Sequence, residues 1–463
     1  MNHVLRSRGR RYADSRERRP GRVVYGMTIA QSAAALLRGQ LGWFGDRGWD
    51  VHLVTSPGRL LGVVEAREHV TVHPLPMDRE ISLRRDPMAL VRWIRLLHRL
   101  RPDVLNVGTP KAGLIGALAG WLTRVPVRVY VLRGLRLEGA RNRRQKALLW
   151  LAERVTILLA TEVVVVSHSL RDEAAALHLF GRDDEPVVIG SGSSNGVNPQ
   201  RWNAALAAVD RATVRASWGV GPDILVVGFV GRINRDKGVD DLISAFLATP
   251  PPCAVLLLAG PLEDEGLRPA IAALGDRVIH VDEWVDDPAA CYAGMDVLCL
   301  PTRREGFPNV VLEAALAGVP SITTTATGAR DSVVPADTGW LVETGDVPQL
   351  IGAIARCAAD RDEVARAGHA ARERALRHFR PQDIWSGLEA VYLGGHTSRA
   401  ITSGRDRSEP ETGARHGVRR GAAGPQPVPE HRSPANRREV AGRGPLVNSV
   451  GFFESDPERG GTS

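Results

Sequence analysis

Short apolar runs alternate with amphipathic stretches over most of the chain, from about residue 22 to residue 395. In the first half, runs typical of buried strands occur at 22–28, 51–55, 69–74, 104–107, 127–132, 162–166 and 186–189. Stretches with helical periodicity stand between them, at 33–44, 87–100, 112–122, 145–159 and 170–180. Strands that alternate with helices of this length predict a doubly wound parallel sheet.

A second alternating series follows a turn-rich segment at 190–198 (GSGSSNGVN) and a polar stretch to residue 221. We interpret this segment as the end of one domain and a linker. Further strands are predicted at 224–230, 254–259, 278–281, 297–300 and 321–324. Further helices are predicted at 239–247, 267–274, 288–293, 309–317, 348–359, 363–378 and 381–392. The α/β pattern thus predicts two similar domains, at 22–199 and 200–395.

Both ends of the chain lack this pattern. Residues 1–21 are rich in arginine, and residues 396–463 consist largely of Gly, Pro, Ser, Arg and Glu. Neither segment can bury enough apolar surface to offset its chain entropy, so both are predicted to be disordered tails. No apolar core of a signal peptide follows the basic start, and no run reaches the ~18 apolar residues of a membrane span. We therefore expect a cytoplasmic protein.

The overall composition, 43% hydrophobic and 24% charged, is that of a globular protein. The formal net charge of +8 comes almost entirely from arginine, because the chain holds few lysines. No basic stripe with interleaved aromatic residues accompanies it, so nucleic acid is not an expected partner. The four cysteines form no C-x-x-C pair, and we expect them to be buried free thiols, Cys253 and Cys299 within apolar runs. No metal-ligand cluster is visible, and no metal is expected.

Two carboxylates frame the clearest chemical motif, EGFPNVVLE, which runs from Glu305 to Glu313. Glu305 follows the apolar run 297–300 in a loop, where ligands of open α/β sheets bind. Glu313 lies about one turn into the next predicted helix, and the free amides at the start of that helix suit an anion. Outside this context, two such glutamates would be ordinary surface residues; with it, they predict a site for a phosphate and a diol such as ribose.

A basic loop, GRINRDKG, follows the first predicted strand of the second half. Arg232 and Lys237 place two cations over the same crevice, where they could neutralise a diphosphate. The alternative is a solvated basic loop, which the neighbouring carboxylate motif makes less favoured.

These two motifs together, G-R-x4-K-G and E-G-F-P-N-x3-E, resemble the retaining family 4 glycosyltransferases. Four motifs of the first half, GTPKAG at 108–113, VLRGLRLE at 131–138, VSHSL at 166–170 and GSGSSNGV at 190–197, are similar to a bacterial subgroup of that family. That subgroup builds capsule, exopolysaccharide and lipid-linked oligosaccharides. The resemblance implies the GT-B fold, two facing Rossmann-like domains with an interdomain cleft, in which the last helix crosses back to the first domain.

The resemblance also implies residue roles. Arg232 and Lys237 would bind the donor diphosphate, Glu305 the hydroxyls of the transferred sugar and Glu313 the ribose. The backbone around the sugar and phosphate would come from Gly306, Phe307, Pro308 and Asn309. The loop containing Val285 would pass the base.

One departure concerns Arg133, since many relatives carry histidine at this position. Arg133 can stabilise phosphate charge but is a poor proton acceptor at neutral pH. With Glu305, Arg232 and Lys237 it completes the candidate catalytic set. Thr28 and Lys111, each in a loop after a predicted strand, are the further candidates of the acceptor-binding N-terminal domain.

The resemblance therefore implies transfer of a hexose or N-acetylhexosamine from a nucleoside diphosphate sugar, with UDP as the expected carrier. The acceptor would be a glycan hydroxyl, most simply on a polyprenyl diphosphate at the inner face of the plasma membrane. The basic segment 133–146 would face that membrane or the acceptor diphosphate, unless it is a solvated helix start. No cofactor or metal is expected. Two alternatives stay open: a nucleotide-sugar epimerase, and a non-catalytic GT-B partner subunit.

Overall fold

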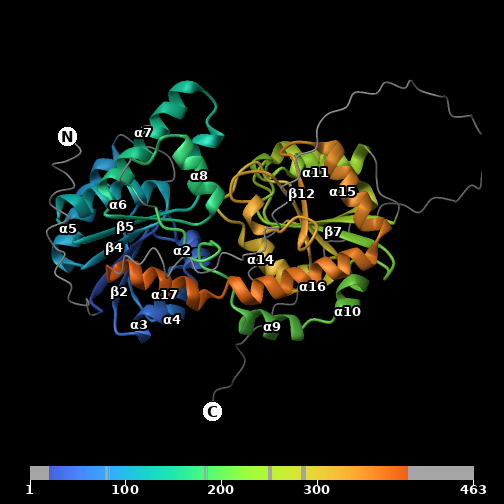
Figure 1. The fold of residues 1–463 in the computed structure, drawn as a ribbon, viewed down its shortest axis with the longest axis horizontal. Helices are drawn as coiled ribbons and strands as arrows, with labels where there is room; N and C mark the ends of the chain where they lie inside the picture. Colours follow the sequence, from blue (N-terminus) through green and yellow to red (C-terminus); the bar gives the residue numbers. More distant parts are fainter. Residues whose placement is uncertain are drawn as a thin grey trace, which may run out of the picture. The chain divides into compact units, whose positions relative to one another are not determined.

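The computed structural model describes residues 20–394, apart from 79–81, 83, 182–183, 185, 249–252 and 283–287. These residues form two parallel sheets, each of six strands, with helices packed around them (Figure 1). The predicted α/β class is therefore confirmed. The two predicted disordered tails fall outside the described residues, except for residues 20 and 21.

The first sheet has the strand order β3-β2-β1-β4-β5-β6, and all of its paired strands are parallel. Its strands are β1 (Arg22–Gly26), β2 (Asp50–Thr55), β3 (Thr71–Pro74), β4 (Val104–Val107), β5 (Val127–Leu132) and β6 (Glu162–Val165). The central strands β1 and β4 are buried almost throughout, as a sheet with helices on both faces requires.

The second sheet has the equivalent order, β12-β11-β10-β7-β8-β9, again fully parallel. Its strands are β7 (Leu225–Val230), β8 (Ala254–Ala259), β9 (Val278–Val281), β10 (Val297–Leu300), β11 (Ser321–Thr324) and β12 (Gly339–Val342). In both sheets the first and fourth strands lie side by side. The order in which successive strands are added to the sheet reverses at this point, and such switch points are where doubly wound sheets bind ligands.

Helices connect most of the strands. Those of the first half are α2 (Ala30–Leu36), α3 (Gln40–Asp46), α4 (Leu61–Glu68), α5 (Arg85–Leu100), α6 (Pro110–Leu122), α7 (Arg143–Leu159) and α8 (His168–Ala176). Those of the second half are α9 (Pro199–Ala207), α10 (Arg211–Ser217), α11 (Val239–Ala248), α12 (Arg268–Ala272), α13 (Ala289–Gly294), α14 (Asn309–Leu316), α15 (Val347–Ala359), α16 (Arg361–His378) and α17 (Pro381–Tyr392). None of these helices is long and apolar enough to cross a membrane.

Several predicted elements of the first half were wrong. The single helix expected at 33–44 is two helices, α2 and α3, because Gly39 adopts a left-handed conformation (φ +76°) between them. The strand expected at 186–189 reduces to one bridge, in which Val187 pairs with Val164. Pro186 has no N–H to extend the pairing.

The segment after residue 198, which was interpreted as a linker, contains two helices that the sequence pattern did not predict. Asn198 caps α9 and Asp210 caps α10 through their side-chain oxygens. Trp202 of α9 is buried, and its ring lies 5.5 Å from that of Tyr292 in α13. This segment is therefore part of the packing around the second sheet.

The expectation of four buried thiols holds for three cysteines and fails for Cys253, which is exposed. Cys253 has a positive φ of 55° in the turn that leads into β8, so its side chain does not enter the strand's apolar face. The other three are buried.

The last helix, α17, packs against residues of the first sheet. The Tyr392 hydroxyl donates to the Tyr25 hydroxyl at 3.0 Å and accepts from the Asn106 amide at 2.5 Å. Glu389 accepts a hydrogen bond from the Trp49 indole at 3.0 Å. These contacts attach the end of the folded chain to its first half.

Candidate functional site

Two loops meet at the switch point of the second sheet. One follows β7 and spans 231–238; the other follows β10 and spans 301–308. Because β7 and β10 are adjacent and parallel, both loops leave the same sheet edge. The Asp236 carbonyl accepts hydrogen bonds from the Arg303 N–H at 3.0 Å and from the Thr302 hydroxyl at 3.2 Å. The sequence prediction that the two motifs share one crevice is consistent with these contacts.

Gly238 allows this close approach. Its φ is +69°, and a Cβ at this position would lie 1.8 Å from the Pro301 carbonyl oxygen. No other residue type fits without moving one of the loops. The conformation also ends the short helix Arg235–Lys237 and directs the chain into α11.

Lys237 and Glu305, one from each loop, form an ion pair between Nζ and Oε1. Both side chains are largely buried, with 20% and 15% of their surface exposed. The structure thus brings together two candidate residues that lie far apart in sequence. The pair holds an ammonium and a carboxylate at the switch point, where each is available to a ligand that carries the opposite charge or hydroxyl groups.

Arg232 takes a different partner. Its Nη1 donates to Glu263 Oε2 at 2.8 Å, and Asn234 donates to the same oxygen at 2.9 Å. Both side chains of this Arg–Glu pair are more than one-third exposed, so the pair is weak and open to exchange with a stronger anion. Glu263 follows β8, and no motif of the sequence pointed to it.

The start of α14 provides backbone donors beside the ion pair. The helix begins at Asn309, as predicted, and has no side-chain cap, because Pro308 occupies the N-cap position. Asn309 Oδ1 is buried without a hydrogen-bond partner among the described residues. An uncapped helix start attracts anionic ligands.

Glu313 lies on α14, and a residue of α13 binds its carboxylate. Its Oε2 accepts a hydrogen bond of 2.8 Å from the hydroxyl of Tyr292, a buried residue of α13. Burial, and then the neighbouring carboxylate, raise the pKa of Tyr292 well above its usual value, so the hydroxyl remains a donor. Tyr292 fixes the orientation of Glu313, and sequence reasoning missed it. Val285 lies outside the described residues.

The loop after β10 also packs against the end of β5. A Cβ on Gly306 would lie 2.2 Å from the Arg133 carbonyl oxygen, so only glycine fits there. Phe307 is buried, with its ring 5.3 Å from that of Phe379. The candidate residues of the second half therefore adjoin the candidate Arg133 of the first.

Comparison with known proteins assigns this arrangement to a family. The family described as "Glycosyl transferases group 1" matches residues 224–360, and the "Glycosyl transferase 4-like domain" matches residues 28–192. The capsular polysaccharide biosynthesis glycosyltransferase CapM of Staphylococcus aureus is 34% identical over 375 residues, which cover 80% of this chain and 96% of that protein. The chain belongs to the group 1 glycosyltransferases.

Other relatives are more distant. An Escherichia coli enzyme named UDP-Gal:alpha-D-GlcNAc-diphosphoundecaprenol alpha-1,3-galactosyltransferase is 25% identical over 302 residues, 61% of this chain and 73% of that enzyme. The crystal structure of Anabaena HepE in complex with UDP-glucose superposes with a TM-score of 0.66 at 21% identity, over 81% of this chain and 99% of that structure. The predicted GT-B fold is confirmed.

In this glycosyltransferase Arg133 is a partly buried cation. Its Nη1 donates to the Ser194 hydroxyl, while its Nε is buried without a partner among the described residues. Burial lowers the pKa of Arg133 to about 10, so the guanidinium stays charged at neutral pH. A buried charge whose hydrogen bonds are not all made is costly, and an incoming anion would relieve that cost.

The other two candidates of the first half have structural partners. The Thr28 hydroxyl lies 2.8 Å from that of Thr109 and accepts from the Ala112 N–H at 3.2 Å. Lys111 is buried, and its Nζ lies 2.8 Å from Asp86 on α5. These partners of the two residues, Thr109, Ala112 and Asp86, all lie in the first half of the chain.

Glu138, the last residue of the VLRGLRLE motif, is a further acidic residue of this region, and the sequence indicated no role for it. Burial raises its pKa, and its side chain is hydrogen-bonded to Thr327. The Thr327 carbonyl in turn accepts the Glu305 N–H at 3.0 Å. Glu138 therefore borders the same loop as Glu305.

Proposed function

We propose that this glycosyltransferase moves a hexose or N-acetylhexosamine from UDP to a hydroxyl of a polyprenyl-diphosphate-linked glycan, with retention at the anomeric carbon. Lys237 and Arg232 would bind the donor diphosphate, and Glu313 the ribose. Glu305 would orient the transferred ring. The reaction would be independent of metal, since these cations and the amides of α14 would stabilise the leaving phosphate.

The observation that carries the proposal is the Lys237–Glu305 pair beside the uncapped start of α14. A diphosphate placed on these amides would draw the Lys237 ammonium toward it. Glu305 would then be released from its ion pair to accept hydrogen bonds from sugar hydroxyls. In the free protein Lys237 and Glu305 would thus neutralise each other. In the complex the donor would supply a new partner for each, the diphosphate for Lys237 and the sugar hydroxyls for Glu305.

Arg133 would contribute from the opposite wall. Its backbone carbonyl lies next to Gly306 of the donor loop, and its guanidinium lies beside Gly108, which follows β4. It would stabilise the phosphate that leaves the sugar, as an oriented cation in a site that excludes water. Its charge at neutral pH rules it out as a general base.

The relatives support the acceptor class. The Escherichia coli galactosyltransferase is named for a diphosphoundecaprenol acceptor, and CapM for capsular polysaccharide biosynthesis. On the present chain, α7 begins with Arg143, Arg144 and Lys146, and the same helix exposes Leu148 and Leu151, which are 52% and 53% exposed. Basic and apolar side chains together are what an anionic membrane surface binds.

Product analysis tests the chemistry. Purified protein is incubated with a panel of UDP-, GDP- and ADP-sugars and polyprenyl-diphosphate sugars, and products are identified by mass spectrometry. We expect transfer from one UDP-sugar, an α-linked product from an α-linked donor by NMR, and unchanged rates with a chelator. An epimerised donor without transfer, or no donor consumption at all, would instead support the epimerase or the partner subunit.

Vesicle binding tests the membrane contact separately. The full chain should sediment with anionic vesicles at low salt and be released as salt rises. Changing Arg143 and Arg144 to Ser, or Leu148 and Leu151 to Ser, should weaken sedimentation. The matched control replaces two exposed arginines of the second half with Ser. Equal sedimentation of all variants would remove the lipid-linked acceptor and leave the donor proposal intact.

A further inference from the structure

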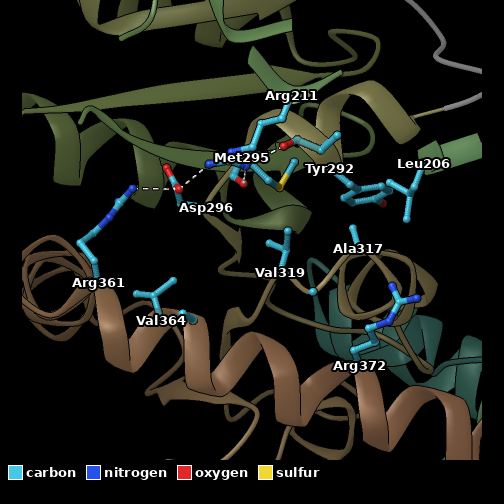
Figure 2. A pocket seen from close by; sticks show the side chains of 13 residues that line it. Leu206, Arg211, Tyr292, Met295, Asp296, Ala317, Val319, Arg361, Val364 and Arg372 are labelled. Carbon is cyan, nitrogen blue, oxygen red and sulfur yellow. Dashed lines mark hydrogen bonds and ion pairs between the residues drawn. The ribbon is translucent and has the colours of Figure 1, made fainter. Parts of the chain in front are cut away.

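A pocket lies at the amino ends of the strands of the second sheet, away from the donor loops. Figure 2 shows it between the α13–β10 junction, which holds Met295 and Asp296, and helix α16. Its volume is about 510 Å³. Met295 and Asp296 precede β10, whereas Glu305 follows it, so the pocket and the donor loops are at opposite ends of the same strand. The proposed donor binding does not use this pocket.

Arginines dominate the wall of the pocket. Arg211 comes from α10, while Arg361 and Arg372 come from α16. The two on α16 are roughly three turns apart and therefore project from one face of the helix, as Figure 2 shows. Among the described residues that line the pocket, Asp296 supplies the one carboxylate.

The carboxylate of Asp296 is shared. Its Oδ1 accepts from Arg211 at 2.7 Å and from Arg361 at 2.9 Å, and its Oδ2 accepts from Arg215, behind the pocket, at 3.2 Å. Three guanidinium groups therefore share a single negative charge. Arg361 Nη1 is buried and has no hydrogen-bond partner among the described residues, so a ligand that reached it would supply a bond that it lacks.

Helix ends account for part of the remaining charge. Arg211 donates to the Ala293 and Met295 carbonyls at the end of α13, and Arg372 donates to the Leu316 carbonyl at the end of α14. A helix C-terminus carries about half a negative charge. Two such ends and Asp296 offset about two of the four arginine charges, with Arg215 behind the pocket included, and the excess of about two would be balanced by a phosphate monoester.

The other lining residues indicate what kind of molecule the phosphate is attached to. Val319, Val364 and Ala317 give it apolar walls, and its volume is far larger than a free phosphate needs. Tyr292, the one aromatic residue among the described lining residues, is fully buried and offers no exposed face for stacking a base. We propose that this pocket binds a phosphorylated sugar and that Tyr292 couples its occupancy to the donor site.

Tyr292 provides a direct physical link between the two sites. Tyr292 is among the lining residues, its ring is buried beneath the pocket surface, and its hydroxyl donates to Glu313 at 2.8 Å. A ligand that displaces the residues covering this ring would change the position of the Glu313 carboxylate, and so change donor binding. This coupling rests on the role proposed for Glu313, whereas binding in the pocket does not.

Calorimetry in a phosphate-free buffer tests binding without turnover. Hexose 1-phosphates and 6-phosphates, the unphosphorylated hexoses and inorganic phosphate are titrated into the full chain. We expect one hexose phosphate to saturate the protein and to bind at least tenfold more tightly than inorganic phosphate or the free hexose. No saturable binding, or equal affinity for inorganic phosphate, would overturn the proposal.

Variants then locate the site. Arg361→Ala should weaken binding at least tenfold, and the fold should persist because Asp296 keeps two other arginines. Ala365→Glu, on an exposed lining residue, should block binding without removing any contact. The controls are Ala365→Gln and Arg366→Ala, which should bind as the wild type does. Unchanged affinity in Arg361→Ala and Ala365→Glu would place the ligand elsewhere.

Two further measurements separate this pocket from the donor site. Binding of the hexose phosphate should survive Lys237→Ala; its loss there would mean that the ligand occupies the donor site. A saturating hexose phosphate should change the donor KM at least twofold in the wild type and leave it unchanged in Tyr292→Phe. An unchanged donor KM in the wild type would refute the coupling, even where calorimetry shows binding.

Discussion

The Lys237–Glu305 ion pair offers the sharpest test of the proposed donor site, because its structural and functional roles predict opposite results. Lys237→Ala removes the ammonium and leaves the Glu305 carboxylate unpaired, with 15% of its side chain exposed. An unsatisfied group at this depth costs about 1–3 kcal/mol of stability. A lost hydrogen bond to the donor diphosphate costs a similar 1.5–3 kcal/mol, or roughly a ten- to hundredfold loss in kcat/KM.

A second substitution separates the two effects. In Lys237→Ala/Glu305→Gln the unpaired charge is gone, so the free energy of unfolding should return to within about 0.5 kcal/mol of the wild type. Transfer should not return, because the double variant lacks both the cation for the diphosphate and the carboxylate for the sugar. Stability is measured by denaturant unfolding, and transfer by steady-state kinetics with the active UDP-sugar.

Arg235→Ala is the matched control. Arg235 belongs to the same short helix as Lys237, but its side chain is 61% exposed and pairs with Asp264. Its loss should change the free energy of unfolding by less than about 1 kcal/mol and kcat/KM by less than about twofold. The reasoning is refuted if Lys237→Ala keeps near-full activity, or if the double variant recovers activity together with stability, since the pair would then be structural only.

Three further predictions concern other parts of the molecule. Glu313→Gln should raise the donor KM with little change in kcat, because ribose binding is shared by ground and transition states; a fall in kcat alone would contradict this. Arg133→Met should stabilise the free protein by removing a partly unsatisfied buried charge, yet lower transfer at least tenfold; unchanged transfer would exclude Arg133 from the site. Burial raises the pKa of Glu153 to about 7, so the folded state binds this proton more tightly than the unfolded chain, and the fold loses stability as the pH rises from about 4.5 through 7. Glu153→Gln should therefore raise the free energy of unfolding by up to about 3 kcal/mol at about pH 8.5 and change little near pH 4.5, while Glu65→Gln, on an exposed residue, should do neither.

Most of both sheets could be predicted from sequence, because buried parallel strands are continuous apolar runs. The failures have local causes. β12 begins at Gly339, where a Cβ would lie 2.1 Å from the Ser321 carbonyl oxygen. The need for glycine here comes from the neighbouring strand β11, and no hydrophobic pattern in the sequence marks it, so β12 was not predicted. Helix α4 was missed because its buried Glu68 resembles a surface residue; its carboxylate in fact accepts from the N–H groups of Gly39 and Gly42 at 2.8 and 3.1 Å.

For the candidate site, sequence spacing predicted the loops but not the pairing. The two loop motifs were expected to share one crevice, but no pattern indicated that Lys237 would pair with Glu305. The partners Tyr292 for Glu313 and Glu263 for Arg232 come from elements whose approach depends on packing. Tyr292 and Glu263 belong to no recognisable motif, although they orient the motif residues Glu313 and Arg232.

The three candidate cations differ in how the protein compensates them, and that difference has a functional consequence. Lys237 is neutralised by Glu305, and Arg232 by a weak exposed pair with Glu263. Arg133 is partly buried, with Ser194 as its hydrogen-bond partner, and its Nε has no partner among the described residues. In the proposed site, a bound diphosphate would have to break the ion pairs of Lys237 and Arg232, whereas Arg133 has no ion pair to break. We therefore propose that the contact of Arg133 strengthens most as charge develops on the leaving phosphate, so that Arg133 would favour the transition state over the bound donor.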